Sequence, residues 1–183
     1  MRVVAIVAAV GCAGCGRFAF DARNDGGDVG TSPFIIQIEA ESGFIVPPFR
    51  VEQDTMNPSI FFVVDGNTHG LSGGGSVSFT VKIPSLRSYY LWTRSRPFDE
   101  TEDSFMMSLD GSPPVDFWTG DCVYGVDWHW NRWRNNNVQC PALGPTIGID
   151  FTAGDRSIVF TSREGDSMLD QLLLTDDESY VPN

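Results

Sequence analysis

The sequence predicts an all-β fold, an antiparallel jelly-roll sandwich of about eight short strands. Several segments alternate apolar and polar residues with a period of two, which is the pattern of a strand with one buried face. Clusters of Gly, Pro, Asp and Ser separate these segments, and the 183 residues include 19 Gly and 11 Pro. No amphipathic run of helical period is long enough to anchor a helical fold.

The predicted strands follow one another along most of the chain. In the clearest of them, VSFTVKI, every second residue is apolar, so one face is expected to be buried. The eight segments are FIIQIEA (34–40), IFFVVDG (60–66), VSFTVKI (77–83), YYLWTR (89–94), SFMMSL (104–109), TIGIDF (146–151), RSIVFTS (156–162) and LDQLLLT (169–175). Two antiparallel sheets packed face to face would bury the apolar face of each strand.

The first fifteen residues have the pattern of an export signal. Arg2 supplies a positive charge, and an apolar run of eight residues and a segment with two cysteines follow. Such a run is too short to span a bilayer, which needs about 20 residues. The ending CAGC is similar to a bacterial lipobox, in which the signal is cut before a cysteine that then carries lipid. We expect a signal peptide over residues 1–14 and lipid on Cys15, with Cys12 in AVGC as the alternative.

The segment after this signal is expected to be a tether. Residues 15–33 are rich in Gly and Asp and show no alternation, which is typical of a flexible linker. The sandwich is then expected over residues 34–183. The predicted location is the cell envelope, as an exported bacterial lipoprotein at the outer membrane on its periplasmic or surface side. Contact with the membrane would be through the lipid anchor only.

Composition limits the partners that the protein is expected to have. The chain has 24 Asp and Glu against 12 Lys and Arg, a formal net charge of -12, and Lys82 is its only lysine. Phosphate backbones would be repelled, so nucleic acid is not an expected partner. The sequence has 42% hydrophobic residues, which suits one domain with a real core. No long exposed apolar stripe stands out, and we expect a monomer.

Two cysteines lie in the second half of the chain. In an oxidising compartment an even pair is usually bonded, and we expect a disulfide between Cys122 and Cys140. On the chain-entropy model a loop of this length would stabilise the fold by roughly 3 kcal/mol. The alternative is a metal site, but the segment between the cysteines has only one His and no second Cys pair.

Five segments, in this order, resemble the jelly-roll domains related to carbohydrate-binding module family 6. They are IEAESG (38–43), SYYLWTRSR (88–96), DSFMMSLDG (103–111), DWHW (127–130) and REGDSMLDQLLLTDDESYVP (163–182). The resemblance extends over residues 34–182, and its last segment is the most specific. The chain departs from the family pattern at Asn57 to Ser59, where such domains often carry a Ser-Gly-Gly turn, and by its cysteine pair.

The resemblance implies a structural calcium ion. In that family two glutamates near the start and an aspartate near the C-terminus hold the ion, and the matching positions here are Glu39, Glu41 and Asp170. Alternation over the first strand places the two glutamates on one face. The alternative to a calcium site is that this face is polar and simply exposed to solvent. Asp170 could equally cap a turn or pair with Arg163. Carboxylate oxygens suit a hard cation, which would clamp the first strand to the last.

The segment 116–137 is the candidate ligand loop, since it carries six aromatic residues among Asp, Arg and Asn. Flat apolar faces stack on sugar rings, and amides and carboxylates pair with hydroxyls. The resemblance places one ligand-stacking aromatic in this loop, for which Trp118 and Trp128 are the candidates. The predicted ligand-binding residues are Trp118, Tyr124, Trp128, His129 and Trp133, although a single Trp is more often part of the core.

A second aromatic group lies in the segment YYLWTR. In strand register Tyr90, Trp92 and Arg94 share one face. A cation stacked on the indole as a structural pair is the favoured interpretation, and a second concave binding site is the alternative.

Catalytic patterns are weak in this sequence. A close pair of carboxylates, Glu39 and Glu41, is not enough for a glycosidase, and the pair lies at the start of the predicted domain. No Gly-x-Ser-x-Gly elbow is present, and His69 and His129 are the only histidines. The sequence therefore predicts non-catalytic carbohydrate binding by a membrane-anchored lipoprotein. The alternative is a structural or protein-interaction lipoprotein that keeps the sandwich but binds no sugar.

Overall fold

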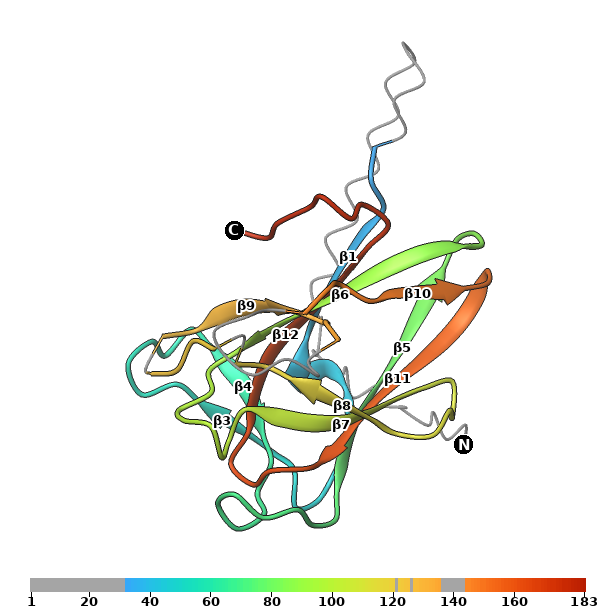
Figure 1. Ribbon diagram of the computed structural model, residues 1–183. Helices are drawn as coiled ribbons and strands as arrows, with labels where there is room; N and C mark the ends of the chain where they lie inside the picture. The colour runs from blue at the N-terminus through green and yellow to red at the C-terminus, as the bar shows by residue number, and fades with distance from the viewer. Residues whose placement is uncertain (1–31, 121, 126, 136–143) are drawn as a thin grey trace, which may run out of the picture. The chain divides into compact units, whose positions relative to one another are not determined.

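The computed structural model describes residues 32–120, 122–125, 127–135 and 144–183 of the chain. In this part the chain forms twelve strands and a short 3-10 helix, η1 (Ala40–Ser42) (Figure 1). The strands are β1 (Ile35–Glu39), β2 (Phe44–Val46), β3 (Arg50–Gln53), β4 (Phe61–Val64), β5 (Ser76–Ile83), β6 (Arg87–Ser95), β7 (Ser104–Leu109), β8 (Val115–Trp118), β9 (His129–Arg132), β10 (Gly148–Phe151), β11 (Gly154–Ser162) and β12 (Met168–Thr175).

The strands form two antiparallel sheets, which confirms the predicted β-sandwich. The larger sheet has the order β10-β6-β12-β4-β3, with β1 also paired to β12 and β9 also paired to β6. The smaller sheet has the order β2-β5-β11-β7-β8. Figure 1 shows β12 crossing the larger sheet between β6 and β4, so the last strand of the chain lies inside this sheet.

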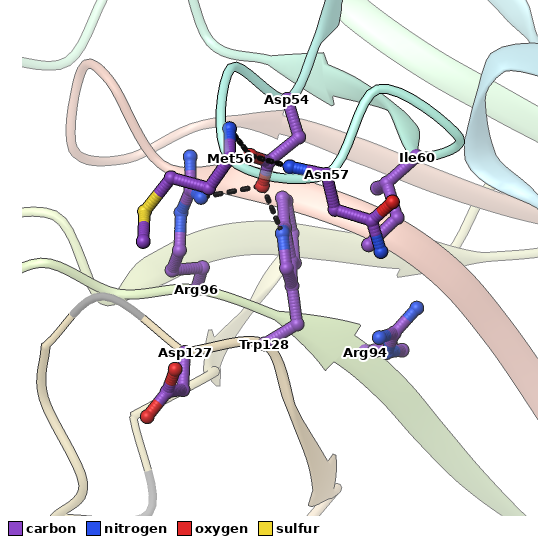
Figure 2. Close-up of a pocket in the computed structure, with 8 residues that line it drawn as sticks. All are labelled: Asp54, Met56, Asn57, Ile60, Arg94, Arg96, Asp127 and Trp128. Carbon is purple, nitrogen blue, oxygen red and sulfur yellow. Dashed lines mark hydrogen bonds and ion pairs between the residues drawn. The ribbon is translucent and has the colours of Figure 1, made fainter.

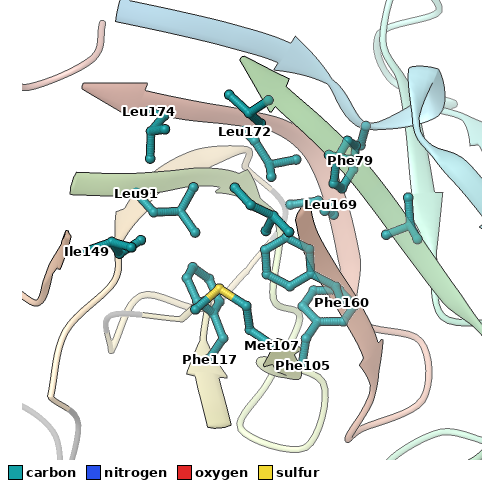
Figure 3. Close-up of a cluster of buried hydrophobic side chains, with 14 of the residues drawn as sticks. Phe79, Leu91, Phe105, Met107, Phe117, Ile149, Phe160, Leu169, Leu172 and Leu174 are labelled. Carbon is teal, nitrogen blue, oxygen red and sulfur yellow. The ribbon is translucent and has the colours of Figure 1, made fainter. Parts of the chain in front are cut away.

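The core lies between the two sheets and follows the predicted alternation (Figure 3). Phe160 of β11 is fully buried, and its ring centroid lies 5.3 Å from Phe117, 5.7 Å from Phe105 and 6.3 Å from Phe79, in edge-to-face pairs. Such aromatic pairs contribute about 0.5 to 1.5 kcal/mol each beyond the area that they bury. The core also includes every apolar residue on the predicted buried face of β5: Val77, Phe79, Val81 and Ile83.

The first predicted strand ends earlier than its alternation suggested. β1 ends at Glu39, and the chain then turns through η1, where the N–H of Gly43 donates to the carbonyl of Ala40 at 3.1 Å. This turn carries the chain from the larger sheet to β2 in the smaller one. A Cβ on Gly43 would lie 2.7 Å from the Phe79 side chain, so the turn needs glycine there. Glu39 and Glu41 therefore do not follow one strand register, and that expectation was wrong.

Four strands were not predicted: β2, β3, β8 and β9. Each has only three or four residues, too few for a period of two to stand out in a sequence. Pairing with longer neighbours defines them, as when β9 pairs with the second half of β6. No helix among the described residues is long and apolar enough to cross a membrane.

Candidate functional site

A pocket of about 400 Å³ lies beside the larger sheet, where three segments meet (Figure 2). The connection between β3 and β4 forms one wall, the end of β6 forms another, and the residues just before β9 form the third. Because Tyr89 and Leu91 of β6 face the core, Arg94 projects from the opposite face of the sheet. The lining residues are Asp54, Met56, Asn57, Ile60, Arg94, Arg96, Asp127 and Trp128.

Asp54 anchors this pocket. Its side chain is buried and accepts hydrogen bonds from the backbone N–H groups of Met56 at 2.7 Å and Asn57 at 3.1 Å, which shape the β3–β4 turn. It also accepts from Trp128 Nε1 at 2.5 Å and from Arg96 Nη1 at 2.6 Å. Burial by itself would raise the pKa of Asp54, but the donors and the charge of Arg96 together hold this pKa below its usual value.

Trp128 is fixed in place by its neighbours. The Arg96 guanidinium lies 4.7 Å from the centroid of the indole, and the Phe62 ring packs against it at 5.1 Å with a tilt of 56°. Figure 2 shows Trp128 between Arg96 on one side and Ile60 and Arg94 on the other. The indole is thus a rigid wall of the pocket, oriented by one hydrogen bond and two ring contacts.

The remaining polar groups of the pocket differ in their exposure and pairing. The side chains of Asn57 and Asp127 are exposed, and Arg94 Nη1 forms an ion pair with Asp170 Oδ2 at 2.6 Å. Two arginines and two aspartates line the pocket, so their formal charges cancel. A neutral ligand with many hydroxyls fits this balance better than a strongly charged one.

Of the five residues predicted to bind ligand, only Trp128 lines this pocket. Trp118, at the end of β8 in the smaller sheet, instead stacks under the Arg163 guanidinium at 4.2 Å. Trp133 packs against the hydrophobic core. His129 begins β9, and its Nδ1 lies 3.2 Å from the carbonyl of Asp127.

Tyr124 has a structural contact of its own. Its hydroxyl donates to the buried Asp103 Oδ2 at 2.9 Å. Burial raises the pKa of Asp103 to about 7, the hydrogen bond from Tyr124 works against this shift, and the negative charge of Glu164 adds to it. The bond ties the segment after β8 to the start of β7 and places Tyr124 away from the pocket lining.

The β3–β4 turn supplies half of the pocket and was missed as a site. The sequence signal was the pattern Asp-x-x-Asn-Pro-Ser from Asp54 to Ser59, which favours a turn closed by the Asp side chain. Asn57, which lies in this turn, lines the pocket. Arg96 lies just past the end of β6, where alternation no longer assigns a face.

The aromatic face of β6 carries a structural cation pair, but with a different arginine from the one expected. Arg132 of β9 lies 4.6 Å from the Tyr90 ring centroid and 5.4 Å from that of Trp92. The cross-strand pairing of Trp92 with Arg132 brings them together. Arg94 instead turns to Asp170 and the pocket.

The predicted calcium ligands lie near one another at the joint of η1 and β12. Burial raises the pKa of Asp170 to about 6, Arg94 works against this, and the negative charges of Glu39 and Glu41 add to it. Glu41 Oε2 is buried and has no hydrogen-bond partner among the described residues. However, Gln171 Nε2 donates to both oxygens of Glu39, at 2.9 and 3.0 Å.

These three carboxylates are not the tightest group of possible metal ligands. In the described ranges one such group brings three ligand atoms within 4.8 Å of one another, and it consists of His69, Glu102 and Asp166. The calcium site at Glu39, Glu41 and Asp170 therefore stays a prediction.

Several predictions fall outside the described residues. The predicted signal peptide, the candidate lipidation sites Cys15 and Cys12, and nearly all of the predicted tether lie there. Cys140 also lies there, so the bond between Cys122 and Cys140 stays a prediction.

Comparison with solved structures shows the fold shared with carbohydrate-binding modules. A family 35 module from Clostridium thermocellum has a TM-score of 0.54 and 21% identity, over 78% of this chain and 97% of that module. The C-terminal family 6 module of a marine laminarinase from Zobellia galactanivorans has a TM-score of 0.55 and 16% identity, over 78% of this chain and 99% of that one.

Longer enzymes match over part of their length. The exo-β-1,3-galactanase of Phanerochaete chrysosporium in complex with galactose has a TM-score of 0.56 and 18% identity. The match spans 77% of this chain but only 29% of that enzyme. No family model and no curated protein sequence matches the chain. The described domain thus has the fold of carbohydrate-binding modules of families 35 and 6.

Proposed function

We propose that this protein binds carbohydrate without catalysis, through the pocket beside Trp128. The observation that carries the proposal is a rigid indole wall, held by Asp54, Arg96 and Phe62, next to exposed polar groups in a pocket of about 400 Å³. An indole held in one orientation loses little entropy on stacking against a sugar ring. The shared fold with carbohydrate-binding modules supports the same function.

Each wall of the pocket has a role in this proposal. Trp128 and Ile60 offer apolar surface to the C–H face of a sugar, while Asn57 and Asp127 pair with its hydroxyls. Arg94 is available as a further donor, since its ion pair with Asp170 engages Nη1. The balanced charge of the lining favours a neutral poly- or oligosaccharide.

The carboxylates of the pocket support binding rather than hydrolysis. A glycosidase needs two carboxyl groups, one of which donates a proton. Asp54 is buried, accepts from four donors and has a lowered pKa, so it is held ionised as a structural group. Of the two carboxylates that line the pocket, only Asp127 could then act on a substrate, and a glycosidase needs two.

The proposal includes anchoring and a structural metal. Lipid on Cys15 would hold the exported chain at the cell envelope, and residues up to 33 would serve as its tether. Calcium would be held by Glu39, Glu41 and Asp170, and the buried, unpaired Glu41 Oε2 supports this because a carboxylate oxygen is the ligand that calcium prefers. The ion would supply positive charge between three carboxylates and join η1 to β12.

A screen of glycans and polysaccharides, with calcium present, tests the binding proposal. We expect saturable binding that Trp128→Ala abolishes and Asp127→Ala weakens at least several-fold. Trp118→Ala is the matched control, because this Trp lies in the smaller sheet and does not line the pocket. Asp127 is exposed, so its variant remains informative if Trp128→Ala unfolds.

The second candidate is a structural or protein-interaction lipoprotein. The contacts of Arg96 and Phe62 with the Trp128 indole favour this candidate, because a Trp with a purely structural role would make the same contacts. Failure of the folded wild-type protein to bind any glycan would favour this candidate. Binding that Trp118→Ala removes and Trp128→Ala leaves intact would contradict the proposed site.

A further inference from the structure

Three connections meet at one place outside the sugar pocket: residues 65–75 between β4 and β5, 96–103 between β6 and β7, and 163–167 between β11 and β12. Gly165 joins two of them, because its N–H donates to the carbonyl of Leu71 at 3.0 Å and its carbonyl accepts from Gly70 at 3.4 Å. A Cβ on Gly165 would lie 2.1 Å from the carbonyl oxygen of Thr68, so only glycine allows this approach.

Each connection contributes one side chain to a common point. His69 Nδ1 contacts Glu102 Oε1 and lies 3.9 Å from Asp166 Oδ2. The three ligand atoms all lie within 4.8 Å of one another. Glu102 is only 7% exposed, whereas the His69 side chain is 53% exposed, so the cluster has a buried carboxylate on one side and solvent on the other.

The hydrogen bonds of Thr101 determine which His69 nitrogen carries a proton. The Thr101 hydroxyl donates to Asp99 Oδ1 at 2.7 Å, because a carboxylate can only accept. The same oxygen lies 3.2 Å from His69 Nε2 and therefore accepts the Nε2–H. A neutral His69 then has its lone pair on Nδ1, directed at two carboxylates that also have only lone pairs to offer.

Three atoms with lone pairs, His69 Nδ1 and one carboxylate oxygen each of Glu102 and Asp166, then face one another, and a cation between them is required. A proton on Nδ1 would make an ordinary ion pair, and a metal ion would bind all three groups at once. The contact of Nε2 with Thr101 fits a metal site, since a metal-binding imidazole characteristically donates its other N–H to an acceptor that fixes its orientation. Here the Thr101 hydroxyl, backed by Asp99, fills that position.

We propose that His69, Glu102 and Asp166 form a binding site for a divalent transition-metal ion of the zinc class. One imidazole nitrogen with two carboxylate oxygens is a ligand set that zinc accepts, with water in the fourth position on the exposed side of His69. Calcium and magnesium prefer oxygen ligands alone, so the imidazole selects against them. The site is separate from the predicted calcium ligands and does not depend on sugar binding.

The ion would fasten the three connections to one another. The β6–β7 connection also carries Arg96, which stacks on Trp128, and Phe98, which with Met168 lines a second pocket of about 280 Å³. Metal binding at Glu102 would therefore restrain the segment that supports the sugar pocket. Its direct effect is stabilisation of the native state by mass action.

Titration of the full chain with zinc, after its free thiols are alkylated, tests this inference. We expect one equivalent to bind by calorimetry and to raise the melting temperature by about 5 °C at saturation. His69→Ala and Asp166→Asn should each remove this equivalent. His129→Ala is the matched control, because it deletes the other histidine of the chain and should leave binding unchanged.

A positioning variant separates metal binding from a plain ion pair. Thr101→Val removes the acceptor of the His69 Nε2–H and should weaken zinc binding about tenfold, as losses of outer contacts do. Cobalt bound in place of zinc should give a visible spectrum that disappears in His69→Ala. Equal titrations for the wild type and His69→Ala, with both proteins folded, would overturn the proposal and leave a protonated His69 paired with Glu102.

Discussion

At the scale of single residues, Asp54 connects the three segments that form the pocket. It closes the β3–β4 turn through two backbone N–H groups and orients both Trp128 and Arg96. A residue of this kind is hard to recognise in a sequence, because its partners come from three separate segments. The sequence pattern from Asp54 to Ser59 does indicate the turn that Asp54 closes, because that part of its role depends on neighbouring residues only.

Replacing Asp54 with Asn tests this role. The change leaves Arg96 without its buried counter-ion, and we expect the free energy of unfolding to fall by about 2 to 3 kcal/mol. Urea unfolding followed by Trp fluorescence would measure it. Asp127→Asn is the control, since this exposed residue should change stability by less than about 0.5 kcal/mol. Equal stability of Asp54→Asn and the wild type would mean that Asp54 does not hold the pocket together.

The lowered pKa of Asp54 also predicts a dependence on pH. An aspartate with a folded-state pKa below its unfolded value of about 3.9 contributes stability that is present above that pH. This contribution is lost as the pH falls through the lower, folded-state pKa. We therefore expect the wild type to lose more stability than Asp54→Asn as the pH falls from 4 to 2. Parallel stability curves for the two proteins over that range would contradict this.

At the scale of elements, the joint between the first and last strands concentrates negative charge. β1 pairs with β12 along its whole length, from Ile35 with Thr175 to Glu39 with Gln171. η1 then adds Glu41 beside Asp170. Arg94 pairs with Asp170 and Gln171 donates to Glu39, whereas the buried Oε2 of Glu41 has no hydrogen-bond partner among the described residues.

Calcium should stabilise this joint if the ion binds there. Adding 1 mM calcium to metal-free protein should raise the melting temperature by a few degrees, corresponding to about 1 to 2 kcal/mol. Glu41→Gln should remove the response, while His69→Ala should keep it, because His69 belongs to the separate cluster. Identical melting curves with and without calcium would exclude a structural role for the ion.

Long strands were the elements that the sequence predicted well. β5, β6, β11 and β12 have eight or nine residues each, and in β5 and β11 alternation marks the buried face. The short β9 was hidden in an aromatic segment from which five residues were predicted to bind ligand. The core needed Trp133, and Arg163 covered Trp118, so only Trp128 was left at the pocket. Those assignments depend on contacts between distant segments, which a local pattern does not encode.

At the scale of the whole molecule, stability depends on a strand that is late in the sequence. β12 pairs with β6, β4 and β1, and its Leu169, Leu172 and Leu174 lie in the core. A chain cut after residue 167 should therefore be unfolded, with a far-UV spectrum that lacks the β signal. A chain cut after residue 179, beyond β12, is the control and should fold. A cooperative unfolding transition for the shorter chain would contradict this view of the sheet.

The central position of β12 has a consequence for biogenesis. Until residue 175 has left the ribosome, the larger sheet is without the strand between β6 and β4, and its backbone groups there remain unpaired. The nascent chain consequently cannot complete the larger sheet before β12 has been synthesised. In the exported protein that we propose, this strand order would keep the larger sheet from closing until most of the described chain has been made, which suits passage through a translocation channel.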